Sequence, residues 1–323
     1  MKIAIVYHPA RMRETEDKIH GSRRKLLYPT LTRVRKAFQS AHHKVVTIDG
    51  RGNLFAKVRR AKPDIVFNWY SMPGRVQAYV PALLEKMGMP YTGCSSLCHS
   101  LAMHKGLASK VLRYDKLPVP PFALASRKQR EPSRRVEFPV LVKPCSLGSS
   151  IGISEESIVE SAEKLPVAID AALALDKEAV ITKYIPGHEL TVGIIGNKEL
   201  QILPILEKHF KAKQGAPWIF TEKMKKKYAH WHDNVTVPEM TSEEETAVKK
   251  TATRAYRSIG CADFARVDIR LDNQGIPWLL DVNTLPGLYP KFSALTKMAK
   301  EMGKRVEYLA MRILEVAMER YGL

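Results

Sequence analysis

The sequence has no long apolar run. No stretch reaches about 18 apolar residues, the length expected of a transmembrane helix, so we expect no membrane partner. Residues 2–7, KIAIVY, are too short for the core of a signal peptide and predict a buried first strand instead. The apolar content of 45% is that of an ordinary globular protein.

Cysteines and glycine-rich nucleotide motifs are scarce as well. The four cysteines have neither the spacing of a metal site nor the density of a disulfide framework, which predicts a reducing, cytoplasmic location. Neither G-x-G-x-x-G nor the Walker A pattern occurs, so we infer no dinucleotide-binding or P-loop motif. The cysteines are Cys94, Cys98, Cys145 and Cys261.

Acidic residues are outnumbered: 33 Asp and Glu against 52 Lys and Arg give a net charge of +19. Such a charge favours anionic partners, among them nucleotide phosphates, acidic substrates and nucleic acid. The basic residues are spread along the chain, however, and only Lys223–Lys227 is a dense run. Because no aromatic-rich RNA-binding signature accompanies them, we do not expect nucleic acid as the main partner.

Three domains are expected. Residues 1–95 alternate strands with helices, which predicts an α/β domain with a parallel sheet covered on both faces. Residues 96–185 predict a small α+β unit and residues 186–323 a larger one, in which the long polar stretch Glu207–Glu239 is irregular and is the candidate lid. Strands are expected at residues 2–8, 44–49, 64–70, 138–143, 179–185, 189–196 and 200–206, and helices at residues 23–41, 76–87, 97–114, 155–175, 241–259 and from 304.

A predicted hairpin carries the strongest chemical signal. Two apolar strands flank Asp272–Gly275, a segment with strong turn chemistry. A two-residue loop at Gln274-Gly275 places the apolar side chains of both strands on one face, and a slip of one residue would destroy that arrangement. The expected apolar pairs are Val267 with Val282, Ile269 with Leu280 and Leu271 with Trp278.

The opposite face of this hairpin is polar. In the same register Asp268 lies opposite Asp281, and Arg266 lies opposite Asn283. Facing carboxylates repel unless a cation lies between them, and carboxylate and amide oxygens suit Mg²⁺. The hairpin alone leaves a second interpretation open, an exposed face with an ordinary surface ion pair.

A second chemical segment follows the strand at residues 138–143. Lys143 ends this strand, and the loop after it contains Ser149 and Ser150 between glycines. Backbone N–H groups of such a loop and a lysine at the strand end can bind phosphate. Taken alone, a Gly/Ser loop after a strand is more often a simple turn.

A third segment lies around the Pro186-Gly187 break. Lys183, Tyr184 and Ile185 precede the break and could offer backbone groups to a purine, while Glu189 could accept a hydrogen bond from a ribose hydroxyl. The alternative is a strand–turn–strand with a surface glutamate. Lys105, near the start of the helix at residues 97–114, would in isolation be a surface lysine.

Together and in this order, these segments resemble the ATP-grasp superfamily and, within it, the D-alanine–D-alanine ligase family. The resemblance covers the chain from about Pro90 to the C-terminus, and its strongest parts are VKPxxxGSSIGI, GHELTVGIIG and ARVDIRLDxxG…LLDVNTLPGL. It implies an ATP-grasp fold, with residues 1–95 as the pre-ATP-grasp domain, residues 96–185 as the small subdomain and residues 186–323 as the large one.

The resemblance also implies roles for individual residues. ATP phosphates would be held by Lys105 and Lys143 under the loop of Ser149 and Ser150, with Lys223 or Lys225 as the lysine of the lid. Adenine would meet the backbone of Lys183, Tyr184 and Ile185, and the ribose would meet Glu189. Arg266 would stabilise the acyl phosphate and the tetrahedral intermediate. Two Mg²⁺ ions, or Mn²⁺ in their place, would be held by Asp268, Asp281 and Asn283.

The sequence departs from the family pattern at several positions. Asp281 stands where a glutamate is usual, and Thr182 replaces the glutamate that usually precedes Lys-Tyr. The segments that bind substrate in the family differ more, at His8–Arg11, Asn68–Gln77 and Leu288–Phe292. The departures therefore concern the substrate far more than ATP.

We therefore expect an ATP-dependent ligase that joins a carboxylate to an amine through an acyl phosphate, with D-alanine as the substrate and D-alanyl-D-alanine for cell-wall peptidoglycan as the product. One alternative is the same chemistry on other amino acids or peptides. Another is a catalytically silent nucleotide-binding homologue with a regulatory or scaffolding role. The partners are small molecules, and a homodimer is expected only as the commonest default.

Overall fold

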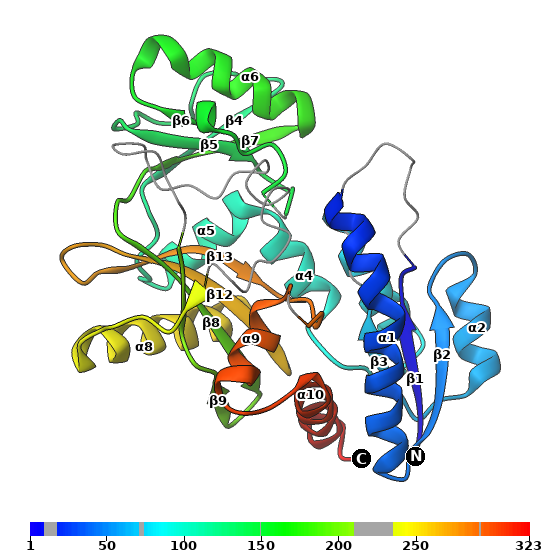
Figure 1. The fold of residues 1–323 in the computed structure, drawn as a ribbon. Helices are drawn as coiled ribbons and strands as arrows, with labels where there is room; N and C mark the ends of the chain where they lie inside the picture. The colour runs from blue at the N-terminus through cyan, green and yellow to red at the C-terminus, as the bar shows by residue number, and fades with distance from the viewer. Residues whose placement is uncertain (10–17, 71–73, 149, 210–234, 291) are drawn as a thin grey trace.

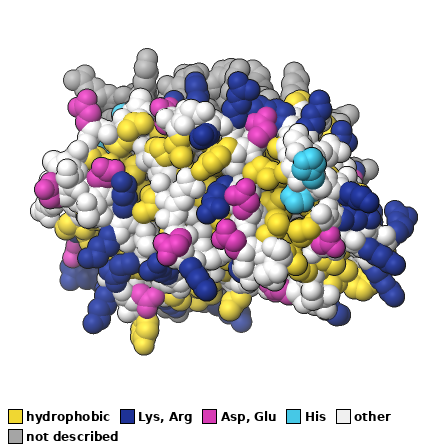
Figure 2. Space-filling model, turned by 90° about the horizontal axis from the view of Figure 1, so that it is seen from below, with side chains coloured by type: hydrophobic (Ala, Val, Ile, Leu, Met, Phe, Trp, Pro, Cys, Tyr) yellow, Lys and Arg dark blue, Asp and Glu magenta, His cyan; other side chains and the backbone are white. Residues whose placement is uncertain are grey.

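The protein consists of three sheets with helices packed on them (Figure 1). The computed structural model describes residues 1–9, 18–70, 74–148, 150–209, 235–290 and 292–323. Among these residues, no helix is both long and apolar enough to cross a membrane. The two ends of the chain lie near each other beside α10 (Val306–Tyr321) (Figure 1). On the face in Figure 2, Lys and Arg side chains are scattered among acidic and apolar ones.

The first sheet is parallel and has the predicted helices on both faces. Its strand order is β2-β1-β3. Along the first strand, Ile3 and Ile5 face one core and Ala4 and Val6 face another, as the alternation of a strand requires. The short second helix was not predicted, and the rest of this unit is confirmed. Its elements are β1 (Lys2–Tyr7), α1 (Lys18–Ser40), β2 (Lys44–Asp49), α2 (Leu54–Ala61), β3 (Ile65–Trp69) and α3 (Tyr79–Lys86).

The predicted helix at residues 97–114 is wrong in one respect, because it is two helices, α4 (Ser96–Met103) and α5 (Lys105–Tyr114). His104 separates them with an extended backbone and accepts a hydrogen bond from the Leu107 amide at its Nδ1, 3.2 Å away. Its Nε2 lies 2.8 Å from the Glu178 carboxylate. The histidine therefore caps α5 and makes Lys105 its first residue.

The second sheet is antiparallel, with strand order β4-β7-β5-β6 and α6 on one face. The helix expected at residues 155–175 begins only at Leu165, where Pro166 favours a helix start. The first strand, β4, lies in a stretch where the sequence predicts no strand. The elements are β4 (Phe122–Ser126), β5 (Val140–Pro144), β6 (Ile158–Val159), α6 (Leu165–Leu175) and β7 (Glu178–Lys183).

The third sheet runs in the order β11-β10-β8-β12-β13, and β9 pairs with β8. The strand expected at residues 200–206 is two short strands. The candidate lid is not irregular throughout, because Lys208 in β10 pairs with Val235 in the edge strand β11 and both side chains are buried. Residues 210–234, with Lys223 and Lys225, lie outside the described residues. The elements are β8 (His188–Gly196), β9 (Leu200–Ile202), β10 (Leu206–Lys208), β11 (Val235–Thr236), α8 (Ser242–Ser258), β12 (Phe264–Leu271), β13 (Pro277–Asn283) and α9 (Ala294–Glu301).

The predicted hairpin is formed by β12 and β13, and its register is confirmed at the chemical end. Arg266 lies opposite Asn283, and Asp268 lies opposite Asp281. This register places both aspartates on one face of the sheet, next to β8 on the other side of β12. Because neighbouring strands fix these positions, the two carboxylates are held toward each other by the backbone.

Nearer the turn, the predicted register is wrong. A bulge at Leu280 shifts the pairing by one residue, so Leu279 takes the buried position opposite Ile269. The turn is also longer than predicted, because the Asp272 carboxylate accepts hydrogen bonds from two backbone amides and from the Trp278 indole. The pairs found are Ile269 with Leu279, Arg270 with Trp278 and Leu271 with Pro277.

Candidate active site

Asp268 lies at the centre of a buried group of charges and is 8% exposed. Both nitrogens of the Arg266 guanidinium fork donate to it, Nε at 3.0 Å and Nη2 at 2.8 Å. Although burial opposes ionisation, the charges of Arg266 and Lys208 hold the pKa of Asp268 well below its usual value. The carboxylate is therefore ionised and can bind a cation, and the guanidinium is fixed beside it.

Lys208 and Arg270 are functional-site residues that sequence reasoning missed. The Lys208 Nζ lies 2.8 Å from Glu189 and 3.4 Å from Asp268, and the Arg270 guanidinium lies 2.9 Å from Glu189. The signal for Arg270 was its place on β12 at the same face as Asp268, two residues away. Lys208 gave no such signal because it fell in the stretch expected to be irregular.

Glu189 was predicted to hold a ribose, and the structure places it within this charge group. It is 9% exposed, and each of its carboxylate oxygens accepts a hydrogen bond, one from Lys208 and one from Arg270. Burial opposes its ionisation, but these two cations lower its pKa. The ribose contact stays a prediction, and two buried cations fix the carboxylate that would make it.

Two predicted phosphate lysines lie beside each other, one on the second sheet and one on a helix. Lys143 is near the end of β5, and Lys105 begins α5, where its Nζ lies 2.6 Å from the Leu147 carbonyl. Burial, followed by the positive charge of Lys105, lowers the pKa of Lys143 to about 8, although the nearby carboxylates of Asp281 and Glu189 oppose this shift. Within the described residues, no carboxylate lies at ion-pair distance from Lys143, so its charge is available to an anion.

The Gly/Ser loop follows Lys143 directly. Ser150 adopts a left-handed backbone with φ of 59°. Two successive turn hydrogen bonds shape the loop, from Ile151 to the Gly148 carbonyl and from Ile153 to the Ser150 carbonyl. Since Lys105 bonds the Leu147 carbonyl, the loop starts beside both lysines. Ser149, its other predicted phosphate ligand, lies outside the described residues.

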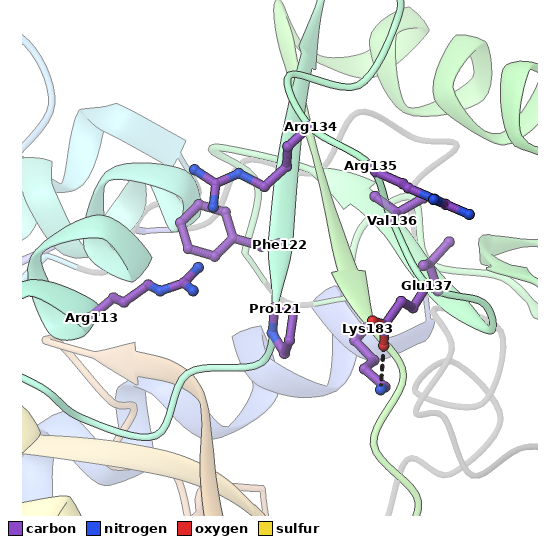
Figure 3. Close-up of a pocket in the computed structure, with 9 residues that line it drawn as sticks. Arg113, Pro121, Phe122, Arg134, Arg135, Val136, Glu137 and Lys183 are labelled. Atoms are coloured by element: carbon purple, nitrogen blue, oxygen red, sulfur yellow. Dashed lines mark hydrogen bonds and ion pairs between the residues drawn. The ribbon is translucent and has the colours of Figure 1, made fainter.

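The predicted adenine segment begins at Lys183, whose side chain pairs with a residue outside this charge group. The Lys183 side chain lines a basic pocket beside Arg113, Phe122 and Arg134, and its Nζ lies 2.8 Å from the exposed carboxylate of Glu137 (Figure 3). In Figure 3 the Arg113 and Arg134 side chains flank the Phe122 ring. The side chain of Lys183 is therefore not a phosphate ligand in this arrangement.

Two backbone amides of the predicted adenine segment already donate hydrogen bonds to other parts of the protein. The Lys183 and Tyr184 amides donate to the carbonyls of Pro121 and Pro139. These two amides are therefore not available to adenine in this arrangement. The role of the segment in binding adenine stays a prediction.

The donor set at the hairpin fits a hard divalent cation. Asp268 and Asp281 face each other across the strands, and Asn283 follows on the same face, with its Oδ1 accepting from the Leu285 amide at 3.2 Å. All three offer oxygen atoms, which Mg²⁺ prefers. The arrangement matches the prediction made from the sequence, with Asp281 one methylene shorter than the glutamate usual in the family.

The segments that depart from the family pattern pack against one another. Trp69, in the first departing segment, lies against Tyr289, in the last, with ring centroids 5.5 Å apart. Gln77 reaches the buried His99 at 3.1 Å, and His99 in turn lies 2.6 Å from the hydroxyl of Thr284, directly after the metal strand. The departures are therefore linked in space and adjoin the metal face.

Comparison with known proteins gives concordant results. The family model described as D-ala D-ala ligase C-terminus matches residues 111–315. A D-alanine–D-alanine ligase of Pelotomaculum thermopropionicum is 30% identical over 317 residues, covering 94% of this chain and 95% of that protein. One of Desulforudis audaxviator is 32% identical over 294 residues, covering 88% and 91%. The crystal structure of the Bacillus anthracis D-alanine–D-alanine ligase complexed with ATP has a TM-score of 0.74 at 23% identity, covering 99% and 98%.

Lysines on β5 and α5 and a carboxylate hairpin on the third sheet are the parts expected of an ATP-grasp protein, and the family model and the named relatives place the chain in that class. Within that class the chain belongs to the D-alanine–D-alanine ligase family, because the family model spans more than half of it and relatives of that name match nearly its whole length.

Proposed function

We propose that the protein is an ATP-dependent ligase that joins two D-alanine molecules and releases ADP and phosphate. One observation carries the proposal: Lys143 on β5, with Lys105 of α5 beside it, lies close enough to Asp281 for the two charges to interact, and Asp281 lies opposite Asp268 on the hairpin. A space bounded by free lysine charges and by metal-binding oxygens suits a nucleotide triphosphate. The family to which the chain belongs supports the same reaction.

The reaction has two steps. The carboxylate of the first D-alanine attacks the γ-phosphorus of ATP, which forms an acyl phosphate and ADP. The amine of the second D-alanine attacks the acyl carbon, and phosphate leaves from the tetrahedral intermediate. When bound, Mg²⁺ would neutralise the phosphate charge, and Asp268, Asp281 and Asn283 would hold it.

The residues of the charge group have separate parts in this scheme. Lys105 and Lys143 would hold the phosphates, and Ser149 and Ser150 would contact them from the loop. Arg266 would stabilise negative charge on the acyl phosphate and on the oxyanion, since its pairing with Asp268 fixes it beside the metal ligands.

Lys208 and Arg270 would act as positioning residues. Both donate to Glu189, the carboxylate predicted to meet the ribose, and Lys208 also reaches Asp268. They link the ribose end of the site to its metal end, so nucleotide and metal ligands would be fixed by one network.

Further features of the proposal concern the whole chain. We place the boundaries of the three functional units at residues 1–95, 96–185 and 186–323, since a separate sheet falls in each. All four cysteines are free thiols, which fits a cytoplasmic location. A homodimer stays a prediction.

A second candidate substrate class has an observation in its favour. Tyr289, which is partly exposed and packs on the buried Trp69, adds an aromatic surface where the family pattern has other residues, next to the network of His99 and Thr284. This surface favours an acceptor other than D-alanine, such as a larger amino acid or a peptide, joined by the same chemistry.

An assay of ADP release separates the candidates. We expect release with D-alanine but not with L-alanine, together with the dipeptide as product by mass spectrometry. Release with another amino acid in the panel and none with D-alanine would support the second candidate. Intact ATP binding without release for any acceptor would contradict the ligase and indicate a silent homologue.

A further inference from the structure

Three of the four cysteines come together in the fold. The Sγ atoms of Cys94, Cys98 and Cys261 all lie within 4.8 Å of one another. The Cys98 and Cys261 sulfurs are 3.9 Å apart although 163 residues separate them in the sequence. The first two come from the start of α4, and the third lies just after α8. The cluster could not be predicted from the sequence, because the spacing of Cys261 from the other two cysteines matches no metal-binding motif.

The spacing of the sulfurs suits one metal ion. Zinc binds thiolate sulfur at about 2.3 Å in a tetrahedral shell, which places the sulfurs about 3.8 Å apart. The 3.9 Å between Cys98 and Cys261 matches that value, and the remaining pairs need to approach by about 1 Å or less. Cys94 and Cys98 are buried and Cys261 is partly exposed, so the fourth ligand position would face solvent.

Two features of the backbone lie against the sulfurs. Cys98 lies in the first turn of α4, at the positive end of the helix dipole. Cys94 accepts a hydrogen bond from the Ala262 amide at 3.4 Å. The buried Asp263 nearby is already neutralised by Arg320, whose nitrogens lie 3.0 and 2.8 Å from its two oxygens. Within the part of the chain that the structure describes, one backbone N–H donates to a sulfur of the cluster, and the neighbouring carboxylate of Asp263 is already paired.

We propose that Cys94, Cys98 and Cys261 form a site for a thiophilic d¹⁰ cation of the Zn²⁺ class, with water as the fourth ligand. Binding replaces three S–H bonds by three metal–sulfur bonds and releases three protons. The three thiolates and a bound divalent ion together then carry a net charge of −1. The ion would tie the start of α4, the helix that carries His99, to the segment between α8 and β12. This structural role is independent of the ligase reaction.

Metal binding by the full-length protein tests the proposal. The reduced protein, in a reductant that does not bind metal, is titrated with Co²⁺ while thiolate-to-metal charge-transfer absorption is recorded. We expect one equivalent of Co²⁺ to bind and Zn²⁺ to displace it. Cys98→Ser and Cys261→Ser should lose the absorption. Cys145→Ser is the matched control and should keep it, and so should Asp281→Asn, which separates this site from the magnesium face.

A second measurement needs no variant. Zn²⁺ should protect Cys94, Cys98 and Cys261 of the wild-type protein from alkylation, as read by peptide mass spectrometry, and leave Cys145 unchanged. Reduced wild-type protein that shows neither charge-transfer absorption nor protection would overturn the proposal. So would exclusive formation of a Cys98–Cys261 disulfide on mild oxidation with no metal uptake by the reduced form, because the cluster would then be a redox pair.

Discussion

Lys143 carries its charge in an environment that disfavours it. Burial and the charge of Lys105 lower its pKa to about 8, from about 10.4 in an unfolded chain. Between these two values the unfolded state binds more protons than the folded state, so this lysine makes the protein more stable as pH rises from about 8 to about 10.4. A bound phosphate favours the charged form of Lys143. The affinity for phosphate therefore falls as pH rises and the lysine loses its proton, whereas the stability of the protein rises.

The affinity for ATP should therefore fall as pH rises above about 8. We expect the Kd measured by calorimetry to increase by up to about tenfold per pH unit in that range. The matched control is Lys143→Arg, whose guanidinium stays charged and should flatten the dependence. An equally steep dependence in this variant would show that Lys143 is not the group responsible.

Asp268 should be needed for turnover. In Asp268→Asn the amide can still accept from Arg266, but the negative charge for the metal is lost, so we expect kcat to fall by about 100-fold or more in ADP release. Asp281→Glu, which restores the residue usual in the family, is the matched control and should stay within a few fold of wild type. Wild-type activity in Asp268→Asn would remove this residue from the metal site.

Lys208 should matter for stability far more than an exposed lysine. Lys208→Met leaves the buried Glu189 with one cation fewer, and loss of one partner of a buried pair costs about 3 kcal/mol of unfolding free energy. Lys249→Met, which breaks the exposed pair with Glu245, should cost less than about 1 kcal/mol. Urea unfolding measures both, and equal effects would contradict the network.

At the scale of elements, Gly187 joins the second sheet to the third between β7 and β8. Its φ is 131°, and a Cβ atom there would lie 2.1 Å from the Leu271 carbonyl oxygen. Gly187→Ala should therefore lower the free energy of unfolding by about 3 kcal/mol or more. At Gly148 a Cβ would meet nothing within 4 Å, so Gly148→Ala is the control and should unfold like wild type. Equal stability of the two variants would contradict the close crossing of strands.

Sequence patterns predicted the elements that apolar periodicity fixes. The three parallel strands at the N-terminus and the chemical end of the hairpin were found because a one-residue slip would expose a whole apolar face. The break at His104 and the bulge at Leu280 were missed because each depends on a partner distant in the sequence, Glu178 for the first and the Pro118 carbonyl for the second. Periodicity contains no information on such contacts.

The residues of the site also fall into those that the sequence pattern predicts and those that depend on distant contacts. The hairpin carboxylates were predicted because both stand in one register, and the role of Lys105 came only with the family resemblance. Lys208 and the thiol cluster could not be predicted, since β10 and α4 meet their partners only through the tertiary fold. Such residues can be identified only from the structure, which shows that segments far apart in the chain are neighbours in the fold.

At the scale of the whole molecule, the first and third sheets share one hydrophobic core. Ile3 and Phe38 of the N-terminal unit belong to the same buried cluster as Ile195, Leu309 and Ile313 from the other end of the chain. Helix α1 packs along α10, and the Arg33 guanidinium lies 2.7 Å from Glu307 across this contact. The second sheet has a separate core beneath α6.

This shared core predicts that residues 1–95 do not fold alone. Without α10 the fragment would expose one apolar face of its sheet and helix, and a chain of that length buries too little other surface to compensate. We expect no cooperative thermal transition by circular dichroism for the isolated fragment, and recovery of one when residues 96–323 are added. A sigmoidal transition of the fragment alone would show that the two sheets are independent, and the α1–α10 contact would then be a docking surface between folded units instead of part of a common core.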